Sequence, residues 1–278
     1  MIVALTGASG FIGSYVLTQL LKKNCQIIIL GRKPPAFLST RNDLKFIKFD
    51  LSNSSYFDYN YIGKPDILIH LAWSGLPNYT SFHHYEFDLP SHYSFLKKIL
   101  STGLKNLFVC GTCAEYGSQN GLMKESMIPR PILPYSFAKN ALRTQLNFLK
   151  NKLDFNFTWG RVFYLYGKGQ SSSSLYHQLC MAVERRDKIF NMSQGEQIRD
   201  FLPVEKAAEI IVSLALMQKD SGIVNVCSGN PVSIKQQVLT WLDMNNWSID
   251  LNLGYYPYSD YEAMNFWGST SKLNKLTV

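Results

Sequence analysis

Long apolar segments and paired cysteines are both missing from this sequence, and each absence narrows the kind of protein it encodes. The longest apolar helical stretch covers only residues 210–217, whereas a membrane-spanning helix needs about 20 apolar residues. No basic segment or small-residue cleavage site precedes the first apolar run, so we expect no secretory signal peptide. The five cysteines are odd in number and scattered, which predicts free thiols. Together these features favour a cytoplasmic protein with no membrane partner.

Charge is also sparse, and its distribution bears on the partners. Charged residues make up 17% of the 278 residues and apolar residues 46%, as is typical of a packed globular protein. The net charge of +8 suits an anionic ligand, but the lysines and arginines are dispersed and no nucleic-acid-binding motif occurs. We therefore expect no nucleic-acid partner. The length allows one large α/β domain, or a nucleotide-binding domain with a smaller lobe.

Two pairs of residues resemble metal or redox sites, but their positions in the sequence argue against either role. Cys110 and Cys113 form a Cys-x-x-Cys pair, but they lie at the end of an apolar strand with no second ligand pair. His83 and His84 are adjacent in the sequence, so they cannot share one face of a helix. We therefore expect no metal site.

Apolar runs alternate with amphipathic segments through the first two-thirds of the chain, which predicts a Rossmann-type, doubly wound parallel α/β sheet. Beyond residue 165 the pattern loosens. We expect a dinucleotide-binding domain over 1–165 with a return segment near 203–228, and a small C-terminal substrate lobe over most of 166–278. The expected strands are 2–6, 26–30, 45–50, 66–71, 105–111, 155–162 and 222–227. The expected helices are 11–23, 84–102, 136–151, 174–186, 203–218 and 233–244.

A glycine-rich loop over residues 7–13 joins the first expected strand to the first expected helix. In this position the first glycine permits a tight turn, the second lets backbone N–H groups approach a pyrophosphate, and the third lets helix and strand pack closely. The helix N-terminus favours the anion. The loop predicts dinucleotide binding through Gly7, Ser9, Gly10, Phe11, Ile12 and Gly13.

Tyr135 and Lys139 are four residues apart at the start of an expected helix, so their side chains share one face. A lysine ammonium beside a phenol favours phenolate, so we expect the pKa of Tyr135 to be lowered. Thr112 follows the apolar strand that ends at Cys110, where it faces the ligand crevice of a parallel sheet. Its hydroxyl can donate a hydrogen bond to a substrate carbonyl oxygen.

The glycine loop, Thr112 before Tyr116-Gly117, and the Tyr135/Lys139 pair occur in an order and spacing that resemble the extended short-chain dehydrogenase/reductase superfamily, in its nucleotide-sugar epimerase/dehydratase branch. The resemblance covers roughly residues 1–240. It implies a Rossmann domain, a nucleotide-diphosphate-sugar substrate, and a homodimer formed through helices 84–102 and 136–151. Further agreement lies in Asp50-Leu51, His70-Leu71-Ala72 and the segments 161–167, 197–202 and 224–229.

The resemblance also implies roles for individual residues. Tyr135 is the general acid/base, Lys139 holds the nicotinamide ribose, and Thr112 polarises the substrate oxygen. Glu115 is interpreted as a substrate contact, the alternative being an ordinary loop carboxylate. The other implied cofactor contacts are Asp50 and Leu51 near the adenine, with Leu71, Ala72 and Phe163. The other implied substrate contacts are Cys113, Tyr164 and Arg199, of which Arg199 meets the diphosphate.

Three departures from the family pattern narrow the function. Members that prefer NAD carry a carboxylate at the end of the second strand, but residues 30–33 contain none, and Arg32 can accept a 2′-phosphate. We therefore expect NADP(H), with NAD(H) as the second possibility. The Asp-Glu pair that dehydratases place after the threonine is replaced by Cys113 and Ala114, which argues against dehydration. Tyr164 replaces an asparagine that many epimerases use to contact substrate.

These observations favour NADPH-dependent reduction of the C4 keto group of a nucleotide-linked 4-keto-6-deoxyhexose. The segment 110–117 also resembles reductases that make deoxysugars for bacterial surface polysaccharide such as O-antigen. One alternative is a nucleotide-sugar 4-epimerase, which uses the same three residues but returns the hydride to its substrate. A second alternative is a non-catalytic, redox-sensing dinucleotide-binding protein, although such proteins usually lose the Tyr135/Lys139 pair.

Overall fold

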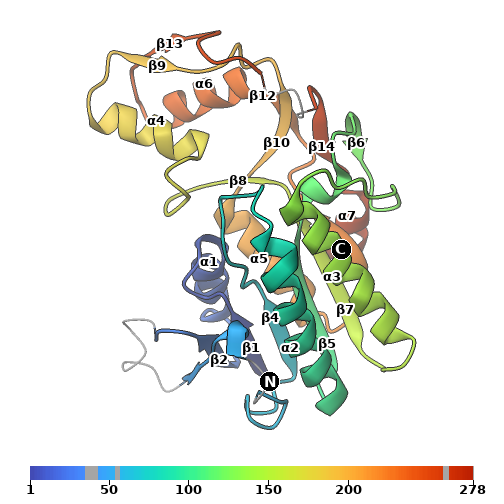
Figure 1. Cartoon of the computed structure of the whole chain (residues 1–278). Coiled ribbons are helices and arrows are strands. Elements are labelled where there is room, and N and C mark those ends of the chain that lie inside the picture. The colour runs from blue at the N-terminus through green and yellow to red at the C-terminus, as the bar shows by residue number, and fades with distance from the viewer. Residues whose placement is uncertain (35–42, 54–56, 259–262, 278) are drawn as a thin grey trace.

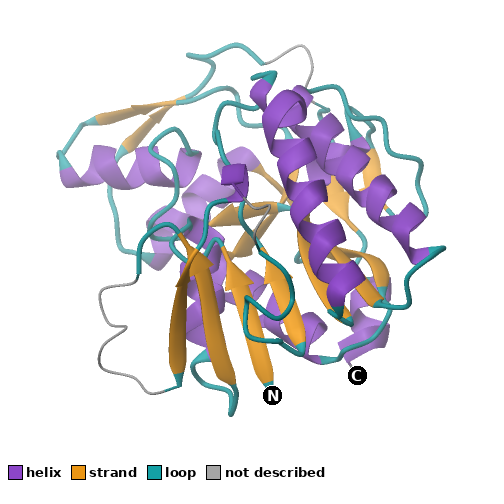
Figure 2. Cartoon of the chain, turned by 60° about the horizontal axis from the view of Figure 1, so that its bottom comes forward, coloured by secondary structure: helices purple, strands orange, loops and turns teal. Residues whose placement is uncertain are grey.

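The largest element of the fold is a parallel sheet of seven strands. A computed structural model describes residues 1–34, 43–53, 57–258 and 263–277. The strands lie in the order β11-β7-β5-β4-β1-β2-β3 and all pair in parallel, so their carboxyl ends share one edge (Figure 2). Their bounds are β1 Ile2–Thr6, β2 Gln26–Gly31, β3 Leu44–Lys48, β4 Ile67–His70, β5 Asn106–Thr112, β7 Asn156–Val162 and β11 Gly222–Val226.

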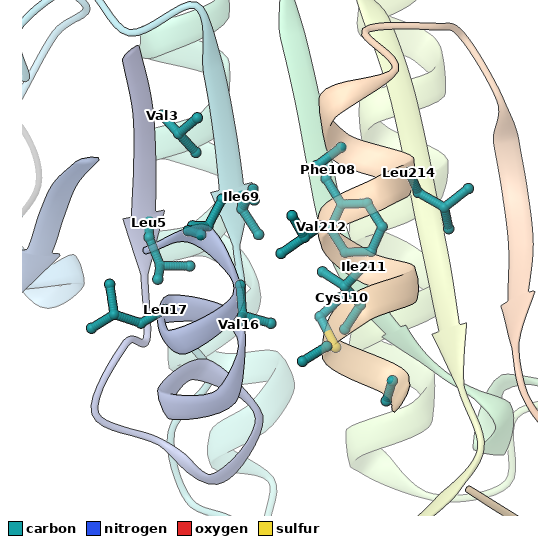
Figure 3. Packing of buried hydrophobic residues seen from close by; sticks show 14 of the residues in the cluster. Val3, Leu5, Val16, Leu17, Ile69, Phe108, Cys110, Ile211, Val212 and Leu214 are labelled. Atoms are coloured by element: carbon teal, nitrogen blue, oxygen red, sulfur yellow. The ribbon is translucent and has the colours of Figure 1, made fainter. Parts of the chain in front are cut away.

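Helices cover both faces of this sheet, as the near-continuous apolar strands require. Successive strand residues point to opposite faces. Val3 and Leu5 therefore join the core under α1 (Phe11–Leu20), α5 (Val204–Leu216) and α7 (Ser271–Thr277) (Figure 3). Ala4 joins the core under α2 (Leu89–Thr102) and α3 (Pro134–Lys150). The predicted doubly wound architecture is confirmed.

The chain continues into smaller sheets and helices near the carboxyl edge of the main sheet, at the top of Figure 1. The helices α4 (Leu175–Glu184) and α6 (Ile234–Met244) pack around the buried Trp241. These sheets have the orders β12-β10-β8, β13-β9 and β14-β6. Their strands are β6 Gly121–Met123, β8 Tyr164–Tyr166, β9 Ile189–Asn191, β10 Ile198–Pro203, β12 Pro231–Ser233, β13 Asp250–Asn252 and β14 Phe266–Gly268.

The expected elements differ from the observed ones mainly at their ends. The helix expected over 84–102 begins instead as a π-helical turn, η3 (His84–Asp88), and becomes α-helical at Leu89. Pro90 in the first turn of α2 has no N–H to donate, which suits the start of an α-helix rather than its middle. The helix expected over 136–151 begins two residues earlier, at Pro134. None of the helices in the described ranges is long and apolar enough to cross a membrane.

The winding direction of the sheet reverses between β1 and β4. The chain passes from β1 to β2 on one side and later returns to β4 on the other, with Thr6 paired with both Leu30 and His70. Ligands of open α/β sheets bind outside the carboxyl ends of the strands at this reversal. The residues that follow β1, β4 and β5 therefore define the candidate site.

Candidate active site

The glycine loop after β1 leaves no room for side chains at two positions. A Cβ on Gly13 would lie 1.9 Å from the Gly7 carbonyl oxygen, and one on Gly7 would lie 2.7 Å from the Ala72 backbone nitrogen. Gly7 also has a φ of +74°, which glycine adopts readily. Gly10 precedes α1 and has no side chain to cap it, so the N–H groups of the first turn are available to an anion. These features fit a dinucleotide pyrophosphate. Beside them, Ser9 is exposed and Phe11 and Ile12 are half-buried.

A buried chain of hydrogen bonds holds the end of β4 against this loop. The Thr6 hydroxyl accepts the backbone N–H groups of Leu71 and Ala72, both at 3.2 Å. Its own hydrogen is thus directed to His70 Nδ1, at 2.9 Å, which leaves His70 Nε2 to donate to His92 Nδ1, at 2.7 Å. Burial lowers the pKa of His70 to about 3 and that of His92 well below its usual range. Both imidazoles are therefore neutral.

The structure brings Tyr135 and Lys139 together on one face of the first turns of α3, as the spacing predicts. Both side chains are buried, and the Lys139 ammonium lies 5.9 Å from the centre of the Tyr135 ring and 2.8 Å from the Cys110 carbonyl oxygen. Burial lowers the pKa of Lys139 to about 8. Burial also raises the pKa of Tyr135 well above its usual value, so the expected lowering is wrong: loss of hydration outweighs the nearby ammonium. The Tyr135 side chain is therefore a neutral phenol.

Thr112 lies at the end of β5 and caps the short helix η4 (Cys113–Tyr116). Its hydroxyl oxygen accepts the Ala114 N–H at 3.2 Å, which leaves the hydroxyl hydrogen for another acceptor. Glu115 is fully buried and accepts the Thr112 N–H at 2.9 Å, the Trp159 indole N–H at 2.8 Å and the Arg161 Nε–H at 2.8 Å. The interpretation of Glu115 as a substrate contact therefore needs correction: its carboxylate faces the core and holds the Thr112 backbone.

The other expected substrate contacts lie close to the small sheet. Tyr164 opens β8 and is 37% exposed. Arg199 lies in β10, only 2% exposed, and donates to the Ile198 carbonyl at 2.9 Å and the Met264 carbonyl at 3.5 Å. Neighbouring segments therefore cover most of the Arg199 side chain. Cys113 is buried, and burial raises its pKa to about 12, so it is a thiol. All five cysteines are free, as expected.

The expected cofactor contacts outside the glycine loop are spread around the sheet edge. Arg32 is exposed just past β2. Asp50 accepts the N–H and hydroxyl of Ser52 at 3.0 and 2.8 Å, and these bonds, with a smaller effect of Arg32, lower its pKa. Leu51 is half-buried in η2 (Leu51–Asn53). Phe163 is only 4% exposed and packs in an internal cluster, so its side chain offers little surface to a cofactor.

Sequence reasoning missed a group of aromatic side chains around Tyr135. Its ring centre lies 6.0 Å from that of Trp73, 5.4 Å from that of Tyr79 and 5.3 Å from that of His84. These residues follow β4 in a segment without periodicity. The one available signal was proximity in sequence to His70-Leu71-Ala72, because residues just after a parallel strand face the crevice.

Comparisons with known proteins agree with this geometry. The sequence profile of the NAD dependent epimerase/dehydratase family matches residues 3–227. A dTDP-6-deoxy-L-talose 4-dehydrogenase (NAD(+)) from Aggregatibacter actinomycetemcomitans is 30% identical, over 97% of this chain and 100% of its own. A GDP-6-deoxy-D-talose 4-dehydrogenase from the same organism is 27% identical, over 98% and 90%. The structure of MoeE5 in complex with UDP-glucuronic acid and NAD superposes with a TM-score of 0.82 at 21% identity, covering 100% of this chain and 92% of that one.

Proposed function

Because the chain belongs to the NAD-dependent epimerase/dehydratase family, we propose that it reduces the C4 keto group of a nucleotide-linked 4-keto-6-deoxyhexose. Two relatives that match nearly the whole chain are named as 4-dehydrogenases of nucleotide-linked 6-deoxytalose. Oxidation at C4 of such a sugar is the reverse of the proposed reduction. The product would be a deoxysugar nucleotide of the kind used for bacterial surface polysaccharide.

The observation that carries this proposal is the neutral phenol of Tyr135, which lies near the buried ammonium of Lys139. A nicotinamide cofactor, when bound, supplies a hydride to the carbonyl carbon. Tyr135 donates its proton to the carbonyl oxygen, and the Thr112 hydroxyl donates a hydrogen bond to the same oxygen as negative charge grows there. The ammonium of Lys139 then stabilises the phenolate that is left, until solvent returns the proton.

The two alternatives make different demands on these residues. An epimerase returns the hydride to the sugar, so it gains nothing from selecting NADPH. A dinucleotide-binding redox sensor needs the glycine loop but not a buried pair such as Tyr135 and Lys139. Both residues are present in a chain whose named relatives include two dehydrogenases, which favours net oxidoreduction.

We further propose a preference for NADP(H). Arg32 is exposed just past β2, and residues 30–33 carry no carboxylate to bind a ribose 2′-hydroxyl. A guanidinium suits a 2′-phosphate in geometry and charge. Because the 30% identical relative is named for NAD(+), NAD(H) stays the second cofactor in this proposal.

The positions of the elements support a division of the chain into a dinucleotide-binding part and a sugar-nucleotide-binding part. We assign residues 1–165, with the return segment near 203–228, to dinucleotide binding, and most of 166–278 to the sugar nucleotide, because Tyr164 and Arg199 lie in the small sheet β12-β10-β8. We also assign the enzyme to the cytoplasm, which suits its free thiols.

Homodimerisation through α2 and α3 is proposed from the exposed apolar residues there. On α3, Phe137 and Phe148 are 51% and 66% exposed, and Phe87 next to α2 is 59% exposed. Light scattering should give twice the mass of the 31.7 kDa chain. A monomer at micromolar concentration would contradict the assignment.

The function is tested by following nicotinamide absorbance with NADPH or NADH and dTDP-, CDP- or GDP-linked 4-keto-6-deoxyhexoses. We expect stoichiometric loss of NADPH with one of these sugars, which also identifies the nucleotide. The Tyr135→Phe variant, assayed in parallel, should show none. Isomerisation of a nucleotide sugar by NMR, without cofactor consumption, would instead establish an epimerase.

A further inference from the structure

Trp73 is held rigidly in the segment that follows β4. Its ring stacks on the His92 imidazole, with centres 4.4 Å apart and planes 18° from parallel. Its indole N–H donates to His84 Nδ1 at 3.1 Å. His84 Nε2 lies 2.7 Å from the Asn78 carbonyl oxygen and donates to it, while Nδ1, which also lies 3.3 Å from Asp88 Oδ2, faces the indole N–H. Stacking on His92 therefore holds the face of the indole, and the hydrogen bond to His84 holds its edge.

The ammonium of Lys139 lies against this fixed indole. Its Nζ is 3.9 Å from the centre of the Trp73 ring, well within the range of a cation–π contact. An ammonium has three N–H groups, and the Cys110 carbonyl accepts one of them at 2.8 Å. The lysine is only 3% exposed, so little water compensates for the lost hydration. The indole face supplies negative electrostatic potential where hydration is missing.

We propose that Trp73 is a positioning residue that keeps Lys139 charged and directed at the active site. This inference rests on the proposed function for the role of the lysine in the reaction, but not for the contact itself. No other feature of the proposed mechanism uses Trp73. The indole acts through Lys139, whose ammonium in turn lies 5.9 Å from the centre of the Tyr135 ring.

The other groups around Lys139 act on its charge in opposite directions. His70 and His92 carry no positive charge, and burial raises the pKa of the Cys110 thiol. Burial has the largest effect on Lys139 and lowers its pKa to about 8, whereas the Glu115 and Asp88 carboxylates raise it. The indole face favours the charged form as these carboxylates do, so its loss should lower the pKa of Lys139. The titratable groups that influence Lys139 or are influenced by it are Cys110 on β5, Glu115 on η4, Asp88 on η3, His70 on β4 and His92 on α2, with Tyr135 on its own helix.

The contact can be tested without cofactor or substrate, by NMR of protein carrying 13C at the lysine ε-carbons. The Lys139 signal is identified by its absence from Lys139→Arg. In the wild type we expect an upfield ring-current shift and a titration midpoint near 8. In Trp73→Leu the shift should vanish and the midpoint fall by about one pH unit, the size expected for a desolvated cation–π contact. Trp73→Phe, which keeps an aromatic face, should retain most of both.

Two comparisons separate positioning from general packing. Trp247→Leu removes a half-buried tryptophan that packs in the cluster around Trp241, and it should leave the titration midpoint of Lys139 unchanged. In the reductase assay, Trp73→Leu should lower kcat about threefold at pH 7.5, as follows from a midpoint one unit lower. As pH rises, the activity of Trp73→Leu should begin to fall about one pH unit below the value at which wild-type activity begins to fall. A uniform loss at every pH, or an unchanged midpoint and shift in Trp73→Leu, would overturn the inference. A failed reductase assay with the expected NMR result would overturn the proposed function alone.

Discussion

Replacing Glu115 by glutamine should destabilise the protein strongly, although the change removes no bulk. The Glu115 carboxylate and the Arg161 guanidinium are both fully buried, and three N–H groups point at the two carboxylate oxygens. A glutamine must turn its NH2 group towards one of these donors. The Arg161 charge would also lose its counter-charge, and the neutral Tyr116 ring, whose centre lies 4.3 Å from the guanidinium carbon, does not replace it.

The loss of stability in Glu115→Gln can be estimated from the burial of the ion pair between Glu115 and Arg161. Removing one partner of a buried ion pair costs about 3–5 kcal/mol. At roughly 2 °C per kcal/mol for a chain of this size, the Tm should fall by about 6–10 °C. Because Glu115 also holds the Thr112 N–H, kcat should fall below the wild-type value at temperatures where the variant is still folded.

Calorimetry or circular dichroism on heating measures the change in Tm. Glu209→Gln is the matched control, since it makes the same substitution in an exposed pair with Lys206, at 2.8 Å on α5. Exposed pairs contribute about 0–1 kcal/mol, so this variant should lose at most about 2 °C. If the two variants unfold within 1–2 °C of each other, roughly the spread expected of exposed pairs, the reasoning about Glu115 is refuted.

The remaining predictions concern the reaction and the cofactor. Tyr135→Phe should abolish turnover while cofactor affinity, measured by calorimetry, stays within a few-fold of wild type; full activity would remove Tyr135 from the mechanism. Arg32→Asp should weaken NADPH at least tenfold relative to NADH in kcat/KM, and an unchanged ratio would show that Arg32 does not select the cofactor. Gly13→Ala places a Cβ 1.9 Å from a backbone oxygen, so titration should show lost cofactor binding; unchanged affinity would mean that the loop tolerates the shift. Wild-type activity should fall as pH rises through about 8, because Lys139 loses its proton. The unfolded chain keeps that proton up to about 10.5, so the contribution of Lys139 to stability should rise between these two pH values; a flat activity profile to pH 10 would contradict the assignment.

The main sheet was predictable because its strands are buried on both faces. Runs such as residues 27–30 are apolar at every position, and alternation with amphipathic helices then indicates a parallel sheet. The short strands of the smaller sheets were not predicted. Most of them are three residues long, too short to show a period of two, and their pairing with distant segments is set by tertiary structure.

At the candidate site, the shared face of Tyr135 and Lys139 was predictable but the electrostatics were not. Spacing placed Tyr135 and Lys139 on one face, yet the pKa of Tyr135 depends on burial that no local pattern reveals. Two of the three partners of Glu115, Trp159 and Arg161, lie on β7, far away in the sequence, so its burial in the core was equally hidden. Trp73 was missed for the same reason, because its contacts come from η3, α2 and α3.

The central claim is net hydride transfer to C4 of a nucleotide-linked sugar, and isotopic labelling tests it most directly. The enzyme is supplied with NADPH that carries deuterium on the reactive nicotinamide carbon, together with the keto sugar that it consumes. We predict one deuterium at C4 of the product by NMR, with an equivalent amount of NADP+ formed. Product without deuterium at C4, or deuterium at another carbon, would contradict the account.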